Sequence, residues 1–133
     1  MPTDEDEKGP LVLVVDDFQD NREMFAEFLS ISGFRVAEAA NGRQAVDLAR
    51  ELLPDIILMD LSLPEIDGWQ ATRMLKADER TKRIPVVALT GHAVSGYTQQ
   101  ATDAGCDALL TKPCAPDLLV SEIHRVLART SGG

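Results

Sequence analysis

Four short apolar runs, each followed by a side chain able to do chemistry, constrain the fold of this chain more than any other feature. Uninterrupted apolar runs that contain β-branched residues are typical of strands buried on both faces of a parallel sheet. In an open parallel sheet, ligands bind outside the carboxyl ends of the strands. We therefore expect the residues that follow the runs to meet at one edge of a sheet. The runs and these residues are 11–15 with Asp16 and Asp17, 56–59 with Asp60, 86–89 with Thr90, and 108–111 with Lys112.

Helix-like segments alternate with the strand-like segments along the chain, and this order predicts the fold class. Alternating strands and helices favour an α/β domain whose right-handed crossovers place helices on both faces of a parallel sheet. We predict a (βα)₅ fold, a doubly wound five-stranded parallel sheet, over residues 11–129. It follows an acidic disordered tail at 1–10 and precedes a flexible tail at 130–133. The predicted helices are 19–32, 42–52 after an Asn41 cap, 66–78, 95–104 and 117–128, and a weaker strand is predicted at 34–39.

The net charge of −9 argues against nucleic acid as a direct partner, because such binding depends largely on Lys and Arg. No apolar stretch approaches the ~20 residues that span a bilayer. The acidic start of the chain is the opposite of a signal peptide. We expect a cytoplasmic protein with no membrane segment. Cys106 and Cys114 lack the spacing of a metal site and are expected to be reduced structural thiols.

The residue types that follow the strands favour phosphoryl transfer. Three neighbouring carboxylates, those of Asp16, Asp17 and Asp60, would repel one another unless a cation were bound. Mg²⁺ suits such a site because it accepts carboxylate oxygens, keeps some waters and recruits phosphate oxygens. Lys112 would add a positive charge and Thr90 a hydroxyl group at the same edge. The set fits a carboxylate that attacks a phosphoryl group while metal and ammonium neutralise its charge.

These residues in this order resemble the receiver domain of two-component response regulators, the CheY-like domain. The segment 58–68, LMDLSLPEIDG, is similar to the stretch around the family's phosphoacceptor, and Lys112-Pro113 matches its basic element. The likeness covers about residues 11 to 128. It implies a flavodoxin-like fold and a signalling switch that catalyses its own Mg²⁺-dependent phosphorylation and slow autodephosphorylation.

The resemblance also implies roles for the acidic residues. Asp60 would accept a phosphoryl group from a phosphohistidine of a sensor histidine kinase or a histidine phosphotransfer protein. Asp17 would bind Mg²⁺ directly, and Asp16 would do so directly or through water. Asp60 and the main-chain carbonyl of Ser62 would complete the protein ligands, and Mn²⁺ could replace Mg²⁺.

Further roles concern the phosphoryl group and its readout. Lys112 would pair with Asp60 and then with the phosphoryl oxygens, and Thr90 would turn toward the phosphoryl group. Gly91 would leave the path of attack open, and Ser62 and His92, which would flank the phosphoryl group, are expected to tune the lifetime of the phosphorylated state. Leu109 stands where many receivers have an aromatic residue that moves with the threonine, so the aromatic movement cannot occur in this chain.

The family resemblance leaves the biological setting open. The downstream target is expected to be a protein that binds the face made by the fourth helix, fifth strand and fifth helix. The protein would be a monomer or a phosphorylation-dependent dimer. A free-standing regulator is the favoured interpretation, and the alternatives are a receiver from a hybrid histidine kinase or a degenerate receiver that binds proteins without phosphorylation.

A phosphatase of the haloacid dehalogenase type is a rival from another class, since it too uses a strand-end aspartate with Mg²⁺. That family needs a second acid two residues after the nucleophile. Phe18 follows Asp16 at that spacing and Ser62 follows Asp60, so both positions fail.

Overall fold

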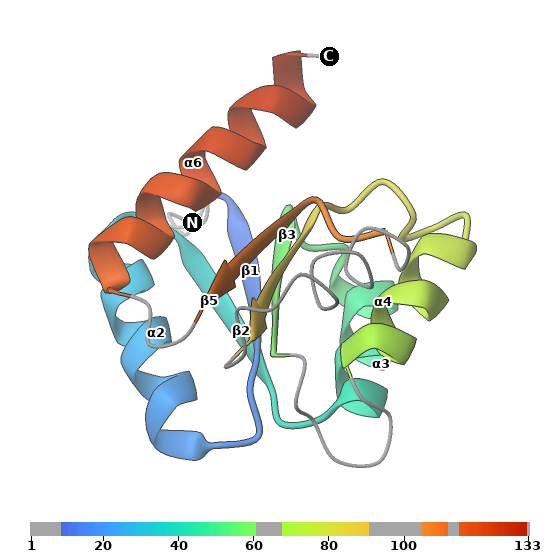
Figure 1. Ribbon diagram of the computed structural model, residues 1–133, viewed down its shortest axis with the longest axis horizontal. Helices are drawn as coiled ribbons and strands as arrows, with labels where there is room; N and C mark the ends of the chain where they lie inside the picture. Colours follow the sequence, from blue (N-terminus) through green and yellow to red (C-terminus); the bar gives the residue numbers. More distant parts are fainter. Residues whose placement is uncertain (1–8, 61–67, 91–104, 112–114, 133) are drawn as a thin grey trace, which may run out of the picture.

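A single five-stranded parallel sheet forms the centre of the molecule (Figure 1). The computed structural model describes residues 9–60, 68–90, 105–111 and 115–132. The strand order is β2-β1-β3-β4-β5, so the predicted doubly wound sheet is confirmed. The strands are β1 (Leu11–Val15), β2 (Arg35–Ala39), β3 (Ile56–Asp60), β4 (Val86–Thr90) and β5 (Ala108–Thr111).

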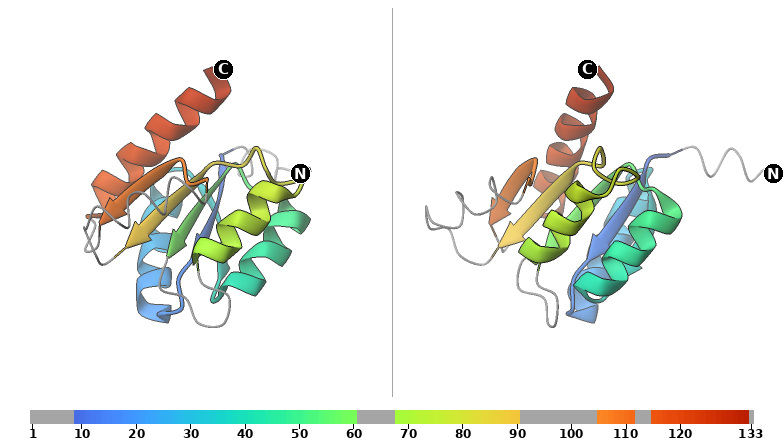
Figure 2. Two further views of the ribbon diagram at one scale, coloured as in Figure 1. Left: turned by 45° about the vertical axis from the view of Figure 1, so that its right-hand side comes forward. Right: turned by 90° about the vertical axis from the view of Figure 1, so that its right-hand side faces the viewer.

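The described helices cover both faces of the sheet in pairs (Figure 2). Buried side chains of α3 and α4 pack with alternate residues of β1, β3 and β4 in one apolar cluster. Those of α2 and α6 pack with the intervening residues in a second cluster on the opposite face. This separation follows from the alternation of side chains along a strand. The helices are α2 (Gln19–Ile31), α3 (Gly42–Leu52), α4 (Gly68–Ala77) and α6 (Pro116–Gly132).

Burial differs between the central strands and the edge of the sheet. Every residue of β3 and β4 is buried, and so is every residue of β1 after Leu11. In β5 residues 108–110 are only partly buried and Thr111 is exposed. The prediction that this last run is buried on both faces is therefore wrong, because β5 is an edge strand with a neighbour on one side only.

Most helix boundaries agree with the sequence prediction, and the last helix differs. The sequence predicts an end near residue 128 and a tail at 130–133, whereas α6 continues to Gly132. Nothing between Ala128 and Ser131 is a helix breaker, and the first strong stop signal is the terminal glycine pair. The predicted helix at 95–104 lies outside the described residues, as do residues 61–67 at the predicted start of α4.

Local signals at the helix ends work as the sequence indicates. The Asn41 side chain accepts a hydrogen bond from the Gln44 amide at 2.8 Å, which caps α3. Gly33 follows α2 with a φ of 100°, a conformation that favours glycine. Leu53, the residue that caps the C-terminus of α3, adopts a left-handed conformation with a φ of 49°, and Pro54 follows it.

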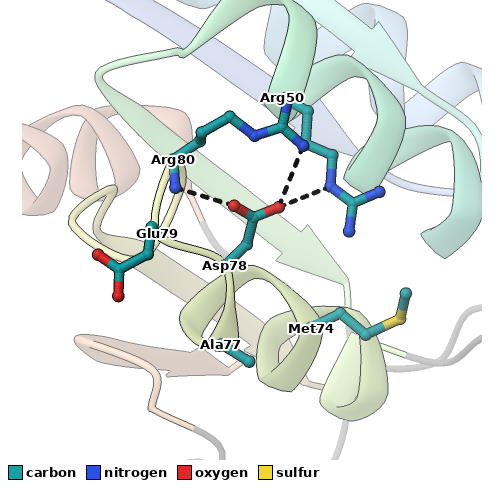
Figure 3. A pocket seen from close by; sticks show the side chains of 6 residues that line it. All are labelled: Arg50, Met74, Ala77, Asp78, Glu79 and Arg80. Atoms are coloured by element: carbon teal, nitrogen blue, oxygen red, sulfur yellow. Dashed lines mark hydrogen bonds and ion pairs between the residues drawn. The ribbon is translucent and has the colours of Figure 1, made fainter.

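At the N-terminal ends of the strands, an ion-pair cluster joins α3 to the loop after α4 (Figure 3). The Asp78 carboxylate accepts a hydrogen bond from Arg50 Nε at 2.9 Å and another from the Arg80 main-chain amide at 2.8 Å. These contacts hold the pKa of Asp78 below its ordinary value, with the Arg80 amide as the largest cause. The cluster lies at the opposite end of the strands from the predicted site.

Candidate functional site

The strand order brings the acidic residues of β1 and β3 together. β1 has β2 on one side and β3 on the other, so the chain reverses its direction of winding at this point. Ligands of doubly wound sheets bind at such switch points, outside the carboxyl ends of the strands. The register pairs Val15 with Met59, which places the next residues, Asp16 and Asp60, side by side. The predicted meeting of these residues at one sheet edge is confirmed.

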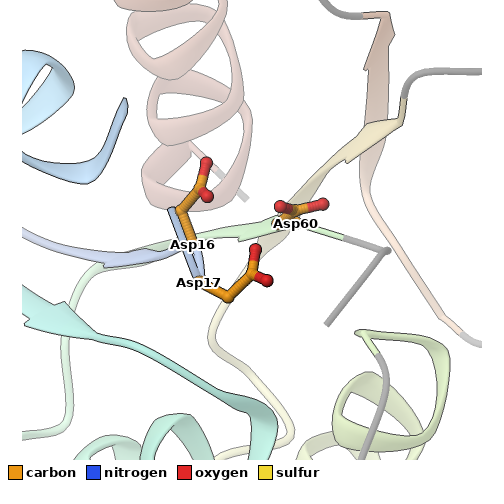
Figure 4. A group of neighbouring side chains, drawn as sticks. All are labelled: Asp16, Asp17 and Asp60. Carbon is orange, nitrogen blue, oxygen red and sulfur yellow. The ribbon is translucent and has the colours of Figure 1, made fainter. Parts of the chain in front are cut away.

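Asp16, Asp17 and Asp60 form a compact carboxylate cluster (Figure 4). One carboxylate oxygen from each residue lies within 4.8 Å of the other two. Asp16 and Asp60 are 1% and 2% exposed, whereas Asp17 is exposed to solvent. In Figure 4 the carboxylates of Asp17 and Asp60 face each other across the space between the two strand ends. The cluster therefore has a solvent-accessible side at Asp17 and a buried side at Asp16.

Hydrogen bonds of the Asp16 main chain and side chain hold the acidic corner at the end of β1. The Asp16 amide donates to the Ala39 carbonyl at 3.1 Å, which ties the corner to β2. The Asp16 Oδ1 atom accepts from the Phe18 amide at 2.9 Å. These bonds turn the chain directly from β1 into α2, so that two successive acids lie at the strand end.

Arg22 of α2 also contacts this corner. Its guanidinium donates to the Asp16 main-chain oxygen at 2.9 Å and to Glu38 Oε1 at 3.1 Å. The patterns that identified the acidic residues do not single out Arg22. The sequence did contain a signal for Arg22. This residue lies near the N-terminus of the predicted helix at 19–32, where a cation interacts unfavourably with the helix dipole, so a compensating tertiary contact is expected.

Thr90 and Leu109 lie in strands, where the sequence predicts strands; apart from these two and the acidic cluster, the predicted site residues lie outside the described part of the chain. Thr90 is buried and ends β4, one residue beyond the position of β4 that pairs with Asp60. In β5, Leu109 pairs with Ala88 and packs against the cluster under α3 and α4. Ser62, Gly91, His92 and Lys112 are the residues that lie outside the described ranges, although Lys112 directly follows the last residue of β5.

The donor set fits a hard divalent cation. Three carboxylates offer only oxygen ligands, and Mg²⁺ binds oxygen from one or two carboxylates while it keeps several waters. Oxygens within 4.8 Å of one another can share such an ion, directly or through one of those waters. A bound cation would also offset the repulsion among the three carboxylates. Within the described part of the chain, no helix is long and apolar enough to cross a membrane.

A comparison with protein families matches residues 12–124 to the response regulator receiver domain. Among characterised proteins, the chain is similar to the polar-differentiation response regulator DivK of Brucella anthropi. The two are 37% identical over 116 residues, which cover 87% of this chain and 94% of the relative. DivK of Brucella ovis matches with the same identity and coverage.

Solved receiver structures have the same fold. The chemotaxis protein CheY4 of Vibrio cholerae superposes with a TM-score of 0.85 at 29% identity, over 89% of this chain and 98% of CheY4. The receiver domain of the sensor histidine kinase PA1611 of Pseudomonas aeruginosa has a TM-score of 0.80 and is 37% identical, over 94% of this chain and 99% of that domain. The PA1611 structure contains a magnesium ion coordinated in its active-site cleft.

Proposed function

The chain belongs to the family of response regulator receiver domains, and on that premise we propose that it is a switch phosphorylated on Asp60 by a phosphohistidine donor. The donor is a histidine kinase or a histidine phosphotransfer protein. Phosphorylation then changes the affinity of the chain for a protein target. The cluster of Asp16, Asp17 and Asp60 at the switch point of the sheet is the observation that carries this proposal.

The proposed transfer step uses Asp60 as the nucleophile. A carboxylate oxygen of Asp60 forms a bond to phosphorus as the bond between phosphorus and the donor imidazole nitrogen breaks. The imidazole leaves with the electron pair of that bond, and Asp60 becomes an acyl phosphate. Water later attacks the phosphorus, which releases inorganic phosphate and restores the carboxylate.

The other site residues stabilise charge in this proposal. Asp16, Asp17 and the Ser62 carbonyl would hold Mg²⁺ together with Asp60, and Mn²⁺ could replace it. An ion held there would supply positive charge to the oxygens of the transferring group. Lys112, which follows the end of β5, supplies a second positive charge to the same oxygens.

The proposed output is a shift between two conformations of the domain. A phosphoryl group biases that equilibrium only if it interacts differently with the two states. The buried hydroxyl of Thr90, at the end of the strand next to Asp60, supplies this interaction. Because Leu109 replaces the aromatic partner, the target-binding face made by the predicted helix at 95–104, β5 and α6 responds through Thr90 without an aromatic movement.

Labelling with acetyl phosphate tests the proposal. We expect intact mass spectrometry to show the addition of one phosphoryl group in the presence of Mg²⁺, and none after Mg²⁺ is removed with a chelator. Asp60→Asn should abolish the label. Asp55→Asn is a matched control, because Asp55 precedes the opposite end of the same strand, where its carboxylate accepts from the Leu11 amide at 2.7 Å. This variant should be labelled like the wild type.

Two outcomes would contradict the proposal. A label that persists in Asp60→Asn would assign the phosphoacceptor elsewhere. Complete absence of label in the wild type, from acetyl phosphate and from a phosphorylated histidine phosphotransfer protein alike, would favour a receiver that binds its partners without phosphorylation.

A further inference from the structure

We infer that Arg22 is a positioning residue for the acidic site: its guanidinium fixes the peptide group between Asp16 and Asp17, and thereby the direction of both carboxylates. The inference rests on the proposed function, because it concerns how well the site binds a divalent cation. It assigns to a residue of α2 a role in the geometry of metal ligands at the end of β1.

The contacts of Arg22 join three elements. The side chain begins on α2, donates to the Asp16 carbonyl at the end of β1, and donates to Glu38 in β2. The Arg22 side chain is only 16% exposed, so most of its surface is removed from water. A planar guanidinium held by two acceptors on different strands has little freedom to turn.

The atom that Arg22 contacts explains the effect on the carboxylates. The main-chain oxygen of Asp16 belongs to the peptide group that connects Asp16 to Asp17. A peptide group is planar, so a hydrogen bond to its oxygen also orients the bonds to both flanking Cα atoms. These Cα atoms carry the two carboxylates. Partners outside the ligand shell orient ligands in this way at many metal sites.

The charge of Arg22 lowers the affinity of the site for Mg²⁺, whereas its positioning effect raises that affinity. A cation near three carboxylates disfavours the binding of a second cation, since like charges repel. Replacement of Arg22 by a neutral residue would therefore tighten Mg²⁺ binding if charge were the main effect. The same replacement would weaken Mg²⁺ binding if positioning were the main effect. The sign of the change distinguishes the two roles.

Isothermal titration calorimetry at constant ionic strength measures the dissociation constant for Mg²⁺, and a comparison of variants shows whether it rises or falls. For Arg22→Gln we expect the dissociation constant for Mg²⁺ to rise on the order of 10-fold, as for other partners of metal ligands. Arg22→Lys keeps the charge but cannot offer the planar pair of donors, so its dissociation constant should rise by a smaller factor. Each titration is made well below the unfolding midpoint of the variant, so that loss of folded protein does not contribute.

Arg35→Gln is the matched control. Arg35 also donates to a main-chain carbonyl, that of Gly9, at a distance of 2.8 Å. This contact lies at the N-terminal ends of the strands. The variant loses a contact of the same kind far from the acidic residues. Its thermal stability should fall while its affinity for Mg²⁺ stays that of the wild type.

The results separate this inference from the proposed function. If the wild type binds no Mg²⁺, the proposed function itself fails. If the wild type binds Mg²⁺ and Arg22→Gln binds it equally or more tightly, the inference is overturned. An equal loss of affinity in Arg35→Gln would also overturn it. Should Arg22→Gln not fold, Arg22→Lys decides, and wild-type affinity in that variant would count against positioning.

Discussion

Asp16 and Asp60 are almost completely buried and Asp17 is exposed, so three residues of one type have different environments within one cluster. The exposed member gives solvent and ions access, and the buried members give a fixed geometry. Burial has another consequence at Cys106, on the face of the sheet covered by α3 and α4. Desolvation raises the pKa of the Cys106 thiol to about 11, although a hydrogen bond with Thr72 acts to lower it.

Cys106 should therefore react slowly with alkylating reagents. At pH 8, three units below this pKa, roughly one thiol in a thousand is ionised, and only the thiolate is the nucleophile. We expect iodoacetamide to modify Cys106 at least ~100-fold more slowly than free cysteine, whose pKa is near 8.5. Mass spectrometry in a Cys114→Ser background would measure this rate for one thiol alone. A rate close to that of free cysteine would show that the thiol is more accessible than its packing indicates.

At the scale of elements, charged residues are arranged differently at the two ends of the parallel strands. The edge where the strands end carries the acidic cluster, whose like charges oppose folding. The edge where the strands begin carries paired charges that join elements, as Arg50 and Asp78 do between α3 and the loop after α4. The charges of Arg50 and Asp78 are thus neutralised by each other, while those of the acidic cluster are of one sign and would be neutralised by a bound cation.

The Asp78 cluster predicts a pH dependence of stability. The pKa of Asp78 is lowered in the folded state, so the folded protein binds this proton more weakly than the unfolded chain. The stabilisation is present above the ordinary value of 3.8 and is lost as the pH falls through the lowered pKa. The free energy of unfolding of Asp78→Asn should therefore lie below that of the wild type at neutral pH, and the difference should shrink below pH 3.8.

Urea unfolding of both proteins over a series of pH values would measure this difference. Asp47→Asn is a suitable control, because Asp47 is exposed on α3. A gap between wild type and Asp78→Asn that stays constant down to low pH would show that the Asp78 charge is not what joins the two elements.

At the scale of the whole molecule, the acidic cluster links folding to divalent cations. The chain carries a net charge of −9, and three of its carboxylates are held together at one sheet edge. The unfolded chain separates these groups and has no such site. A ligand that binds only the folded state raises its stability with concentration, by about 2.7 kcal/mol at 100 times the dissociation constant.

Mg²⁺ should accordingly raise the thermal unfolding midpoint well beyond the effect of NaCl at equal ionic strength. Asp60→Asn removes one buried charge from the cluster. We expect this variant to be more stable than the wild type without divalent ions and to gain less from Mg²⁺. Differential scanning calorimetry would measure both effects. Equal shifts with Mg²⁺ and NaCl would mean that only general screening acts on the cluster.

The sequence by itself determined the local features of this protein. The apolar runs of β1, β3 and β4, the Asn41 cap and Gly33 depend on near neighbours along the chain, so their structures could be predicted without the fold. The residue types at the strand ends likewise predicted the acidic site. A general rule about parallel sheets was enough to place Asp16, Asp17 and Asp60 at one edge.

Only the tertiary structure decided which of these groups touch and how deeply each is buried. Strand order and register put Asp16 beside Asp60, and they made β5 a partly buried edge strand. The contact of Arg22 with the Asp16 carbonyl and Glu38 arises where three elements meet. Such contacts depend on distances between segments far apart in the chain, and local periodicity contains no information about those distances.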